Sequence, residues 1–400
     1  MPRVEPETGK IKWYKSDGAK SIYASLISIL IGMAVGTLII LIVGLTKDNI
    51  SVKGCWDGIR LVFLGVFSTG REGGALTFGF NAVNLGNMLF RATPLIMTGL
   101  SVAVAFKTGL FNIGAPGQYL MGTLGTLTVG LTLGWSGCPT WIAWICAFLA
   151  GVLLGALWGA IPGLFKALLN INEVITCIMT NWIAANLVTW WFDAHDAFKN
   201  SAEGGKVGYI IPLKNVGVVT PKWGMDTLFH GSQANGGFWI ACILAIVMWV
   251  IMTKTTFGYE LRACGQNRHA AKYAGINDKK NIVLSMVIAG ALASAGGALY
   301  YLSGNTEFYW STYMSLPSEG FNGIPVALLA ANHPIGVIFA GVFMSMLNVA
   351  GLQLKYLTAY NEYIADIIIA TIVYLSAFSM FIKTMLNGKK KEKKAKGGNE

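Results

Sequence analysis

Two interruptions rich in glycine and proline carry the side chains of this sequence that could do chemistry. Each one breaks a long apolar stretch, at residues 109–118 in the first case and at residues 320–325 and 332–334 in the second. Side-chain amides lie beside the glycines, at Asn112, Gln118 and Asn322. Amides donate and accept hydrogen bonds but do not titrate or act as nucleophiles. These positions therefore predict binding of a polar molecule rather than catalysis.

The interruptions have two alternative meanings. Glycine and proline free backbone polar groups that lipid cannot satisfy, so a broken helix belongs where it lines a cavity or packs on protein. If the two halves of the chain are inverted repeats, the breaks fall at corresponding positions, as expected for a substrate path. The alternative is that the glycines only allow close helix packing, which we prefer for Gly125, Gly151 and Gly155. The candidate path residues are Asn112, Gly114, Gln118, Asn181 and Asn322, although Asn181 could equally hydrogen-bond a neighbouring helix.

The sequence lacks the motifs of a self-energised pump or a membrane enzyme. It contains no phosphate-binding GxxxxGK[ST] loop, so any ATP and Mg²⁺ would be bound by a partner. Carriers driven by an ion gradient usually place carboxylates or histidines deep in their membrane spans. Here Glu173, His333 and Asp366 lie near the ends of spans or in a turn, which disfavours ion coupling. The six cysteines have no metal-binding spacing, and we expect no catalytic residue, metal or cofactor on this chain.

The elements that position these residues are long apolar helices. Hydrophobic residues make up 54% of the chain and charged residues only 12%, about half the charged fraction of a soluble domain. Runs long enough to cross a hydrocarbon core of about 30 Å recur along the chain. They predict an all-α integral membrane protein, a polytopic bundle of about ten transmembrane segments with inverted repeats and broken or re-entrant helices. The runs are 21–46, 84–106, 108–165 (two spans), 174–192, 231–253, 281–306, 320–354 (two spans) and 363–382. Whether residues 321–352 cross twice or form a re-entrant pair stays open.

Positive charges predict the orientation of the bundle. With ten spans, twenty of the thirty Lys and Arg residues fall in cytoplasmic segments and nine outside, which predicts a multi-pass plasma-membrane protein with both termini in the cytoplasm. Arg91 lies within a span, where it either snorkels toward the outer headgroups or contacts substrate. The net charge of +11 predicts contact with anionic lipid rather than nucleic acid. The predicted parts are a cytoplasmic tail (1–20), a transmembrane domain (21–386) with outer loops 47–83 and 193–237 and a cytoplasmic segment 254–281, and a basic cytoplasmic tail (387–400).

The cytoplasmic segment 254–281 is unusual for a simple connector. Within it, residues 257–276 predict a short helix bounded by glycines, basic at the surface and with small alanines on one side. Such a helix suits insertion into a groove on a cytoplasmic partner. A solvated charged loop is the alternative that spacing alone leaves open.

Several motifs resemble the permeases of bacterial nucleoside ABC importers. They are FNIGAPGQYLMG (111–122), ALWGAIPGLFKA (156–167), NEVITCIMTNWIA (172–184), FGYELRACGQNRHAAKYAGI (257–276) and GFNGIPVALLAANHPIGVIFAGVF (320–343). The resemblance implies that 257–276 is the coupling helix that meets the ATPase, carried by Gly258, Glu260, Arg262, Gly265, Ala271 and Gly275. It also implies a cytoplasmic ATP-binding subunit, a second and different permease that completes a heterodimer, and an extracellular substrate-binding lipoprotein.

The resemblance further implies transport of nucleosides across the bacterial cytoplasmic membrane. A simple-sugar or ribose importer is the main alternative, and an ion-coupled carrier is a more distant one. The family often has Glu where this chain has Pro116, and Asp where it has Asn322. These departures leave the exact cargo open, but they do not affect the coupling segment.

Overall fold

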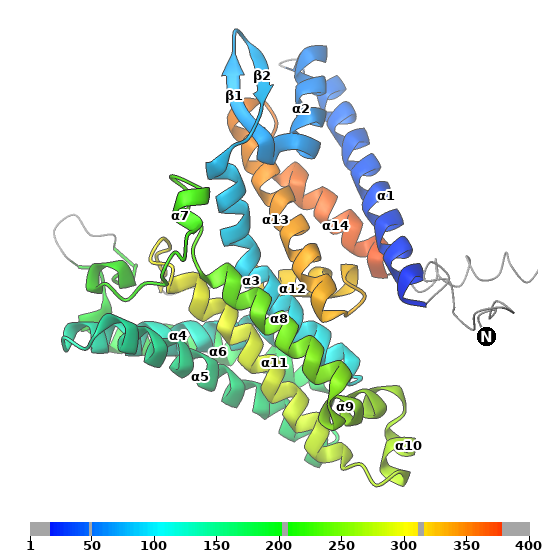
Figure 1. Cartoon of the computed structure of the whole chain (residues 1–400), viewed down its shortest axis with the longest axis vertical. Coiled ribbons are helices and arrows are strands. Elements are labelled where there is room, and N and C mark those ends of the chain that lie inside the picture. Colours follow the sequence, from blue (N-terminus) through cyan, green and yellow to red (C-terminus); the bar gives the residue numbers. More distant parts are fainter. Residues whose placement is uncertain (1–16, 48–49, 202–206, 311–315, 378–400) are drawn as a thin grey trace, which may run out of the picture. The chain divides into compact units, whose positions relative to one another are not determined.

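The computed structural model describes residues 17–47, 50–201, 207–310 and 316–377, which are mostly helical (Figure 1). The predicted tail 387–400, most of the predicted tail 1–20 and the end of the last predicted span lie outside the described residues. The chain divides into two compact units. The larger comprises residues 80–327 and 332–346, and the smaller comprises residues 1–79, 328–331 and 347–400.

The larger unit is a bundle of long helices joined by loops and short helices (Figure 1). Its long helices are α3 (Ala82–Lys107), α4 (Ala115–Trp135), α5 (Thr140–Leu169), α6 (Glu173–Ala194), α8 (Gly237–Lys254), α11 (Asp278–Tyr301) and the first half of α13 (Pro334–Leu357). Its short elements are α7 (Met225–Leu228), α9 (Thr256–Gln266), α10 (Arg268–Tyr273), most of α12 (Ser318–Leu329) and two 3-10 turns (Asp196–Phe198 and Leu213–Val216).

Helix α11 contacts α3, α4 and α5, and small residues let these backbones approach one another. A Cβ on Gly155 of α5 would lie 2.9 Å from the carbonyl oxygen of Gly290 in α11. A Cβ on Gly125 would lie 3.0 Å from the carbonyl oxygen of Ala150, and one on Gly151 would crowd α4. Helix association in lipid depends strongly on such close packing, because lipid tails are as apolar as the side chains. The prediction that Gly125, Gly151 and Gly155 serve packing is confirmed.

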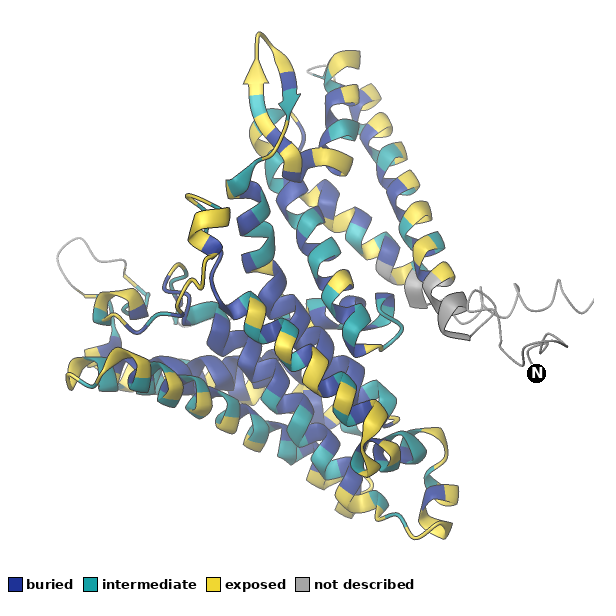
Figure 2. Ribbon diagram, viewed as in Figure 1, coloured by how far each residue is buried: buried dark blue, intermediate teal, exposed yellow. Residues whose placement is uncertain are grey.

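Burial separates central helices from peripheral ones (Figure 2). Over their most apolar windows α3 is 83% buried and α11 is 72% buried, whereas α5 and α8 are each 28% buried. The exposed side chains of α5 are large and apolar and recur every four residues, at Ile145, Leu149, Leu153 and Leu157. A stripe of this kind suits contact with lipid or with another apolar helix.

Seven of the described helices are long and apolar enough to cross a membrane, namely the part of α1 (Asp17–Thr46) from Ser25 onward, α3, α5, α6, α8, α11 and α13. Helix α4 adds 21 residues, a rise of roughly 31 Å. The prediction of a polytopic helical membrane protein is confirmed. The number of about ten spans stays a prediction.

Residues 321–352, whose number of crossings the sequence leaves open, contain one short and one long helix. Helix α12 has 12 residues and rises roughly 18 Å, well short of a hydrocarbon core. A turn at residues 330–333 leads into α13, which has 24 residues. Val337 of α13 packs on Gly99 of α3, and Gly341 of α13 packs on Ile96 of α3. Helix α13 therefore begins on the side of the larger unit where α3 ends.

The smaller unit brings the two ends of the described chain together. Helix α1 packs along α14 (Tyr363–Ala377), and its first four residues show that the helix begins within the predicted tail 1–20. Next come α2 (Val52–Leu64), a 3-10 turn (Gly65–Phe67) and an antiparallel hairpin of β1 (Ser68–Glu72) and β2 (Ala75–Phe78).

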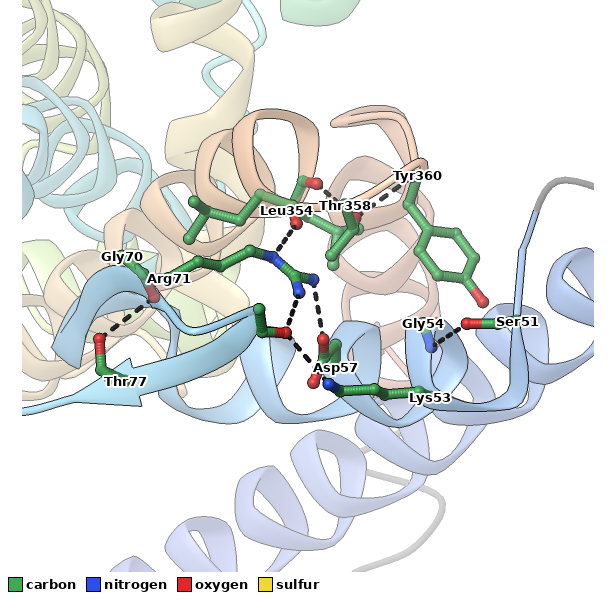
Figure 3. Close-up of polar contacts among 12 residues, drawn as sticks. Ser51, Lys53, Gly54, Asp57, Gly70, Arg71, Thr77, Leu354, Thr358 and Tyr360 are labelled. Carbon is green, nitrogen blue, oxygen red and sulfur yellow. Dashed lines mark hydrogen bonds and ion pairs between the residues drawn. The ribbon is translucent and has the colours of Figure 1, made fainter.

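An ion pair fixes the hairpin to α2 (Figure 3). Arg71 donates to the buried carboxylate of Asp57 at 2.7 Å, and also to the carbonyl oxygens of Gly74 and Leu357 at 3.0 and 2.9 Å. Burial of a charged group is tolerated when it is paired and hydrogen-bonded, as the Asp57 carboxylate is by this guanidinium. The network links α2, the hairpin and the end of α13 within the smaller unit.

Candidate functional site

The two interruptions identified in the sequence meet in the larger unit. A Cβ on Gly320, near the start of α12, would collide with the backbone of Pro116, near the start of α4. A Cβ on Gly323 would lie 2.6 Å from the carbonyl carbon of Thr98 in α3. The Thr98 hydroxyl also donates to the carbonyl oxygen of Glu319 at 3.0 Å. The first turns of the two broken helices therefore lie against each other, beside α3.

Asn112 and Gln118 form a reciprocal amide pair. Asn112 Nδ2 donates to Gln118 Oε1 at 2.7 Å, and Gln118 Nε2 donates back to Asn112 Oδ1 at 3.0 Å. Asn112 Nδ2 also donates to Ser101 Oγ in α3 at 2.9 Å. Both amides are buried, with 0% and 1% of their surface exposed. Because a buried polar group is costly unless it is paired, this pair stabilises the 108–114 loop that leads into α4.

Asn181 of α6 holds the same loop. Its Oδ1 accepts from the Gly117 N–H at 2.9 Å, and its Nδ2 donates to the carbonyl oxygen of Ile113 at 3.0 Å. Gly114 lies in the loop, where a Cβ would come within 3.0 Å of Cys177 Sγ and 3.2 Å of Asn112 Oδ1. The alternative that Asn181 hydrogen-bonds a neighbouring helix is confirmed.

The structure thus brings four of the five predicted path residues into one buried network: Asn112, Gly114, Gln118 and Asn181. Asn322 lies apart from this network on α12, with intermediate exposure. In this conformation the amides form hydrogen bonds with one another and with the backbone at the helix break before α4. They offer donors and acceptors to a polar molecule only when the network opens, so their contact with substrate stays a prediction.

The segment 254–281 contains two short helices where the sequence predicted one. Helix α9 ends at Gln266 because Asn267 has an extended backbone (φ −157°, ψ 104°). The Asn267 side chain then caps α10 by accepting from the Ala270 N–H at 3.0 Å. Thr255 caps α9 in the same way, accepting from the Gly258 N–H at 3.0 Å.

Two glycines allow α9 to pack closely against the membrane helices. A Cβ on Gly258 would collide with the carbonyl oxygen of Ile251 in α8. A Cβ on Gly265 would collide with the carbonyl oxygen of Lys107 and lie 2.9 Å from the backbone nitrogen of Gly109. Gly109 has a positive φ of 74° in the turn that follows α3. Gly265 therefore places α9 directly against the turn that opens the 108–114 loop.

Polar contacts attach the same segment to α11. Glu260 Oε2 accepts from Asn281 Nδ2 at 3.0 Å. Arg268 pairs with Asp278 at 2.6 Å. Ala271 is buried, with 4% of its surface exposed. Arg262 is partly exposed and its Nε donates to the carbonyl oxygen of Gly258 within α9, at 3.4 Å.

Other side chains of α9 and α10 are exposed, and we call five of them the coupling face, after the role that the sequence predicts for this segment: Tyr259, Gln266, His269, Lys272 and Tyr273. Tyr273 is 95% exposed and Tyr259 is 63% exposed. Gly275, with a φ of +81°, follows the end of α10. Exposed aromatic rings such as these are enriched at protein-binding surfaces.

Sequence reasoning missed several partners that complete these sites. Ser101 and Thr98 resemble any small polar residue in an apolar helix, and their spacing gave no signal of the residues they would meet. Asn281 lies at the edge of the predicted segment, but its contact with Glu260 depends on how α9 folds back on α11. Among the described residues, no group of three or more His, Cys, Asp or Glu side chains could hold a metal ion.

Comparisons with known proteins place these motifs in context. Residues 84–377 match the family model described as "Branched-chain amino acid transport system / permease component". The guanosine ABC transporter permease protein NupP of Bacillus subtilis (strain 168) is 34% identical over 370 residues, which are 92% of this chain and 97% of the relative. The nucleoside ABC transporter permease protein NupB of Lactococcus lactis subsp. cremoris (strain MG1363) is 34% identical over 368 residues, 92% of this chain and 93% of the relative. The glucose ABC transporter permease protein TsgB13 of Haloferax volcanii is 30% identical over 304 residues, 75% of this chain and 77% of the relative.

Proposed function

Because this chain belongs to the family of branched-chain amino acid transport system permease components, we propose that it is the transmembrane permease of an ATP-driven importer of nucleosides. The matched residues 84–377 include both helix breaks and the coupling segment. The observation that supports nucleosides as the cargo is the 34% identity, over 92% of the chain, to permeases named for guanosine and for nucleosides. The chain is accordingly a multi-pass protein of the plasma membrane.

The remaining parts of this importer are partners of the chain. A cytoplasmic ATP-binding subunit binds ATP and Mg²⁺, hydrolyses the ATP and docks on the coupling face, so this chain performs no catalysis itself. A second, related permease completes a heterodimer, and an extracellular lipoprotein delivers the substrate. Both termini lie in the cytoplasm of a bacterial cell, which puts the coupling face on the same side as the ATPase.

The contacts of α9 support a direct mechanical route from the ATPase to the path. Gly265 lies against the turn at Lys107 and Gly109. Asn112, only three residues beyond that turn, pairs with Gln118 in α4. A displacement of α9 by the ATPase therefore acts on the loop whose amide network closes the break. Opening of that network frees hydrogen-bonding groups on Asn112 and Gln118 for a passing nucleoside.

A sugar importer is the second candidate, because the glucose permease TsgB13 is 30% identical over 75% of the chain. The shared scaffold explains this similarity without a shared cargo, since a permease fold does not determine what it carries. The two cargoes differ in their chemistry, because a nucleoside adds a flat base that aromatic side chains can stack on.

Reconstitution tests the proposal. Proteoliposomes would hold this chain with its candidate second permease, ATPase and binding protein, and the uptake of radiolabelled guanosine, uridine, ribose and glucose would be measured with and without ATP. We expect ATP-dependent uptake of nucleosides. Uptake of sugars alone would support the second candidate. Uptake that needs no ATP and stops when a proton gradient is collapsed would contradict both.

A further inference from the structure

A cluster of aromatic side chains in the larger unit has no role in the contacts described so far. Phe90 of α3 stacks on Tyr300 of α11, with ring centroids 5.3 Å apart and planes at 15°. Tyr301 meets Tyr300 edge-on at 5.3 Å and Phe308 edge-on at 5.4 Å. Tyr300 and Tyr301 are partly exposed, whereas Phe90 is 5% exposed. Two accessible rings are thus held in place by buried ones.

Tyr119 of α4 adds a buried hydroxyl group next to α11. The residue is 1% exposed, and its hydroxyl has no hydrogen-bond partner among the described residues. A buried donor left unpaired is destabilising, and native structures hold few of them. A ligand that accepts this hydrogen bond in another step of transport would explain why the hydroxyl is there.

Glu319 supplies a carboxylate to the same cluster. Its backbone carbonyl accepts from the Thr98 hydroxyl, and the next residue, Gly320, packs on Pro116, one turn before Tyr119 in α4. A Cβ on Gly297 of α11, one turn before Tyr300, would lie 3.3 Å from the ring of Tyr119, so α4 brings Glu319 and the tyrosines of α11 to the same part of the larger unit. The carboxylate is partly exposed and accepts from the Ser318 hydroxyl at 3.3 Å, which leaves further lone pairs for a ligand. The cluster thus adjoins the point where the two broken helices meet.

We propose that Glu319, Tyr300 and Tyr119 form the nucleobase-recognition site of the transport path, in which the ring of Tyr300 stacks on the base and the carboxylate accepts hydrogen bonds from its edge. This inference rests on the proposed function, because it names the part of the nucleoside that the path recognises. Stacking is available to every base, since every base has a π-face. The Tyr119 hydroxyl donates to a carbonyl oxygen or a ring nitrogen of the same base.

The carboxylate determines which base is preferred. An ionised carboxylate only accepts hydrogen bonds, and its two oxygens match a pair of neighbouring N–H donors. Guanine offers such a pair in its N1–H and its 2-amino group. Uracil offers one N–H flanked by two carbonyl oxygens, which repel a carboxylate. A site built on Glu319 therefore favours guanine-type purine nucleosides over uridine, and over sugars that have no base.

The test uses the reconstituted complete importer and compares initial uptake of guanosine, 1-methylguanosine and uridine at low concentration. Wild type and variants share one binding protein, so a change in the guanosine-to-uridine ratio reports on the permease alone. We expect Glu319→Gln to lower guanosine uptake about tenfold while uridine uptake changes less than about twofold, because an acceptor is replaced by a donor. Glu319→Asp, which keeps the carboxylate, should retain more of the guanosine preference than Glu319→Gln. Wild type should also discriminate against 1-methylguanosine, whose N1 has no hydrogen to donate.

Tyr300 separates stacking from hydrogen bonding. Tyr300→Ala should lower guanosine and uridine uptake by a similar factor of about tenfold, whereas Tyr300→Phe, which keeps the ring, should change neither by more than about twofold. Glu72→Gln in the exposed hairpin of the smaller unit is the control for loss of a carboxylate, and copurification of the whole complex checks folding. Nucleoside uptake with an unchanged guanosine-to-uridine ratio in Glu319→Gln and Glu319→Asp would overturn this inference and leave the proposed function intact. Uptake of sugars alone by the wild type would overturn both.

Discussion

At the scale of residues, the hydrogen-bond partners of a buried amide explain why an amide stands at that position. The examples here are Asn112, Gln118 and Asn181. Each amide lies in the apolar part of the larger unit, where an unpaired donor or acceptor is costly. Each finds its partners in the break before α4 or in the helices beside it. Their chemistry therefore has a structural use whether or not they also touch cargo.

Replacement of Asn112 tests this structural use. Asn112→Leu leaves Gln118 and Ser101 without their partner in a buried place, so we expect the free energy of unfolding to fall by about 1–3 kcal/mol. Unfolding of the purified permease in detergent, followed by intrinsic fluorescence, measures the change. The matched control is Asn186→Leu in α6, where an exposed amide donates to the Trp182 carbonyl of its own helix. An equal loss in both variants would show that the network contributes nothing of its own.

At the scale of elements, α9 acts as a contact between the coupling face and the membrane helices. Both sides of this contact consist of backbone atoms, because Gly265 lies against the turn at Lys107 and Gly109 with no side chain between them. Backbone atoms cannot move aside by a change of rotamer, so we expect this contact to transmit a displacement of α9 with little slack.

A methyl group at Gly265 should uncouple the importer. Gly265→Ala puts a Cβ where the Lys107 carbonyl oxygen lies, and we expect the number of nucleosides transported per ATP hydrolysed to fall about tenfold as α9 leaves its seat. Parallel assays of uptake and phosphate release measure it. Gly54→Ala in α2 is the matched control, because its Cβ would lie 3.4 Å from the nearest side-chain atom. A normal ratio of transport to hydrolysis in Gly265→Ala would refute the mechanical route.

The packing of α9 can be measured through its own cysteine. Burial raises the pKa of the Cys264 thiol, whose residue is 8% exposed, and only the thiolate reacts with maleimide. In a variant that keeps only this cysteine, labelling should be slow at pH 7 and should accelerate as the pH rises toward 9. A cysteine introduced by Tyr273→Cys, at a residue 95% exposed, should react much faster at pH 7. Equal rates at pH 7 would mean that α9 is not packed as described.

At the scale of the whole molecule, the helix ends that lie together show which residues are on the same side of the membrane. Val337 of α13 packs on Gly99 of α3 and Gly341 packs on Ile96, so His333, directly before α13, lies on the side where α3 ends. The predicted orientation makes that side cytoplasmic, the side of the coupling face. The predicted outer loop 193–237 belongs to the opposite side.

Cysteine accessibility tests this orientation. His333→Cys should react with a membrane-impermeant maleimide only from the cytoplasmic side, and Val207→Cys, at a residue 95% exposed in the predicted outer loop, only from the outside. Right-side-out and inverted vesicles provide the two sides, with the native cysteines replaced. Labelling of both positions from the same side would rule out the predicted arrangement.

The sequence by itself determined the class of the protein and the places where its helices break, and it predicted a segment that couples to a partner. These are local properties, because the length of an apolar run, a cluster of glycine and proline, or a capping residue acts within a few neighbours. Only the tertiary structure decided that Gly320 meets Pro116, that Asn112 pairs with Gln118 and Ser101, and that Gly297 of α11 packs on Tyr119 of α4. It also divided the segment 254–281 at Asn267 and limited α12 to 12 residues. Such pairings depend on how helices far apart in the chain cross one another. Each helix contains several small polar residues that could make such a hydrogen bond, and the sequence does not show which of them the packing brings into contact.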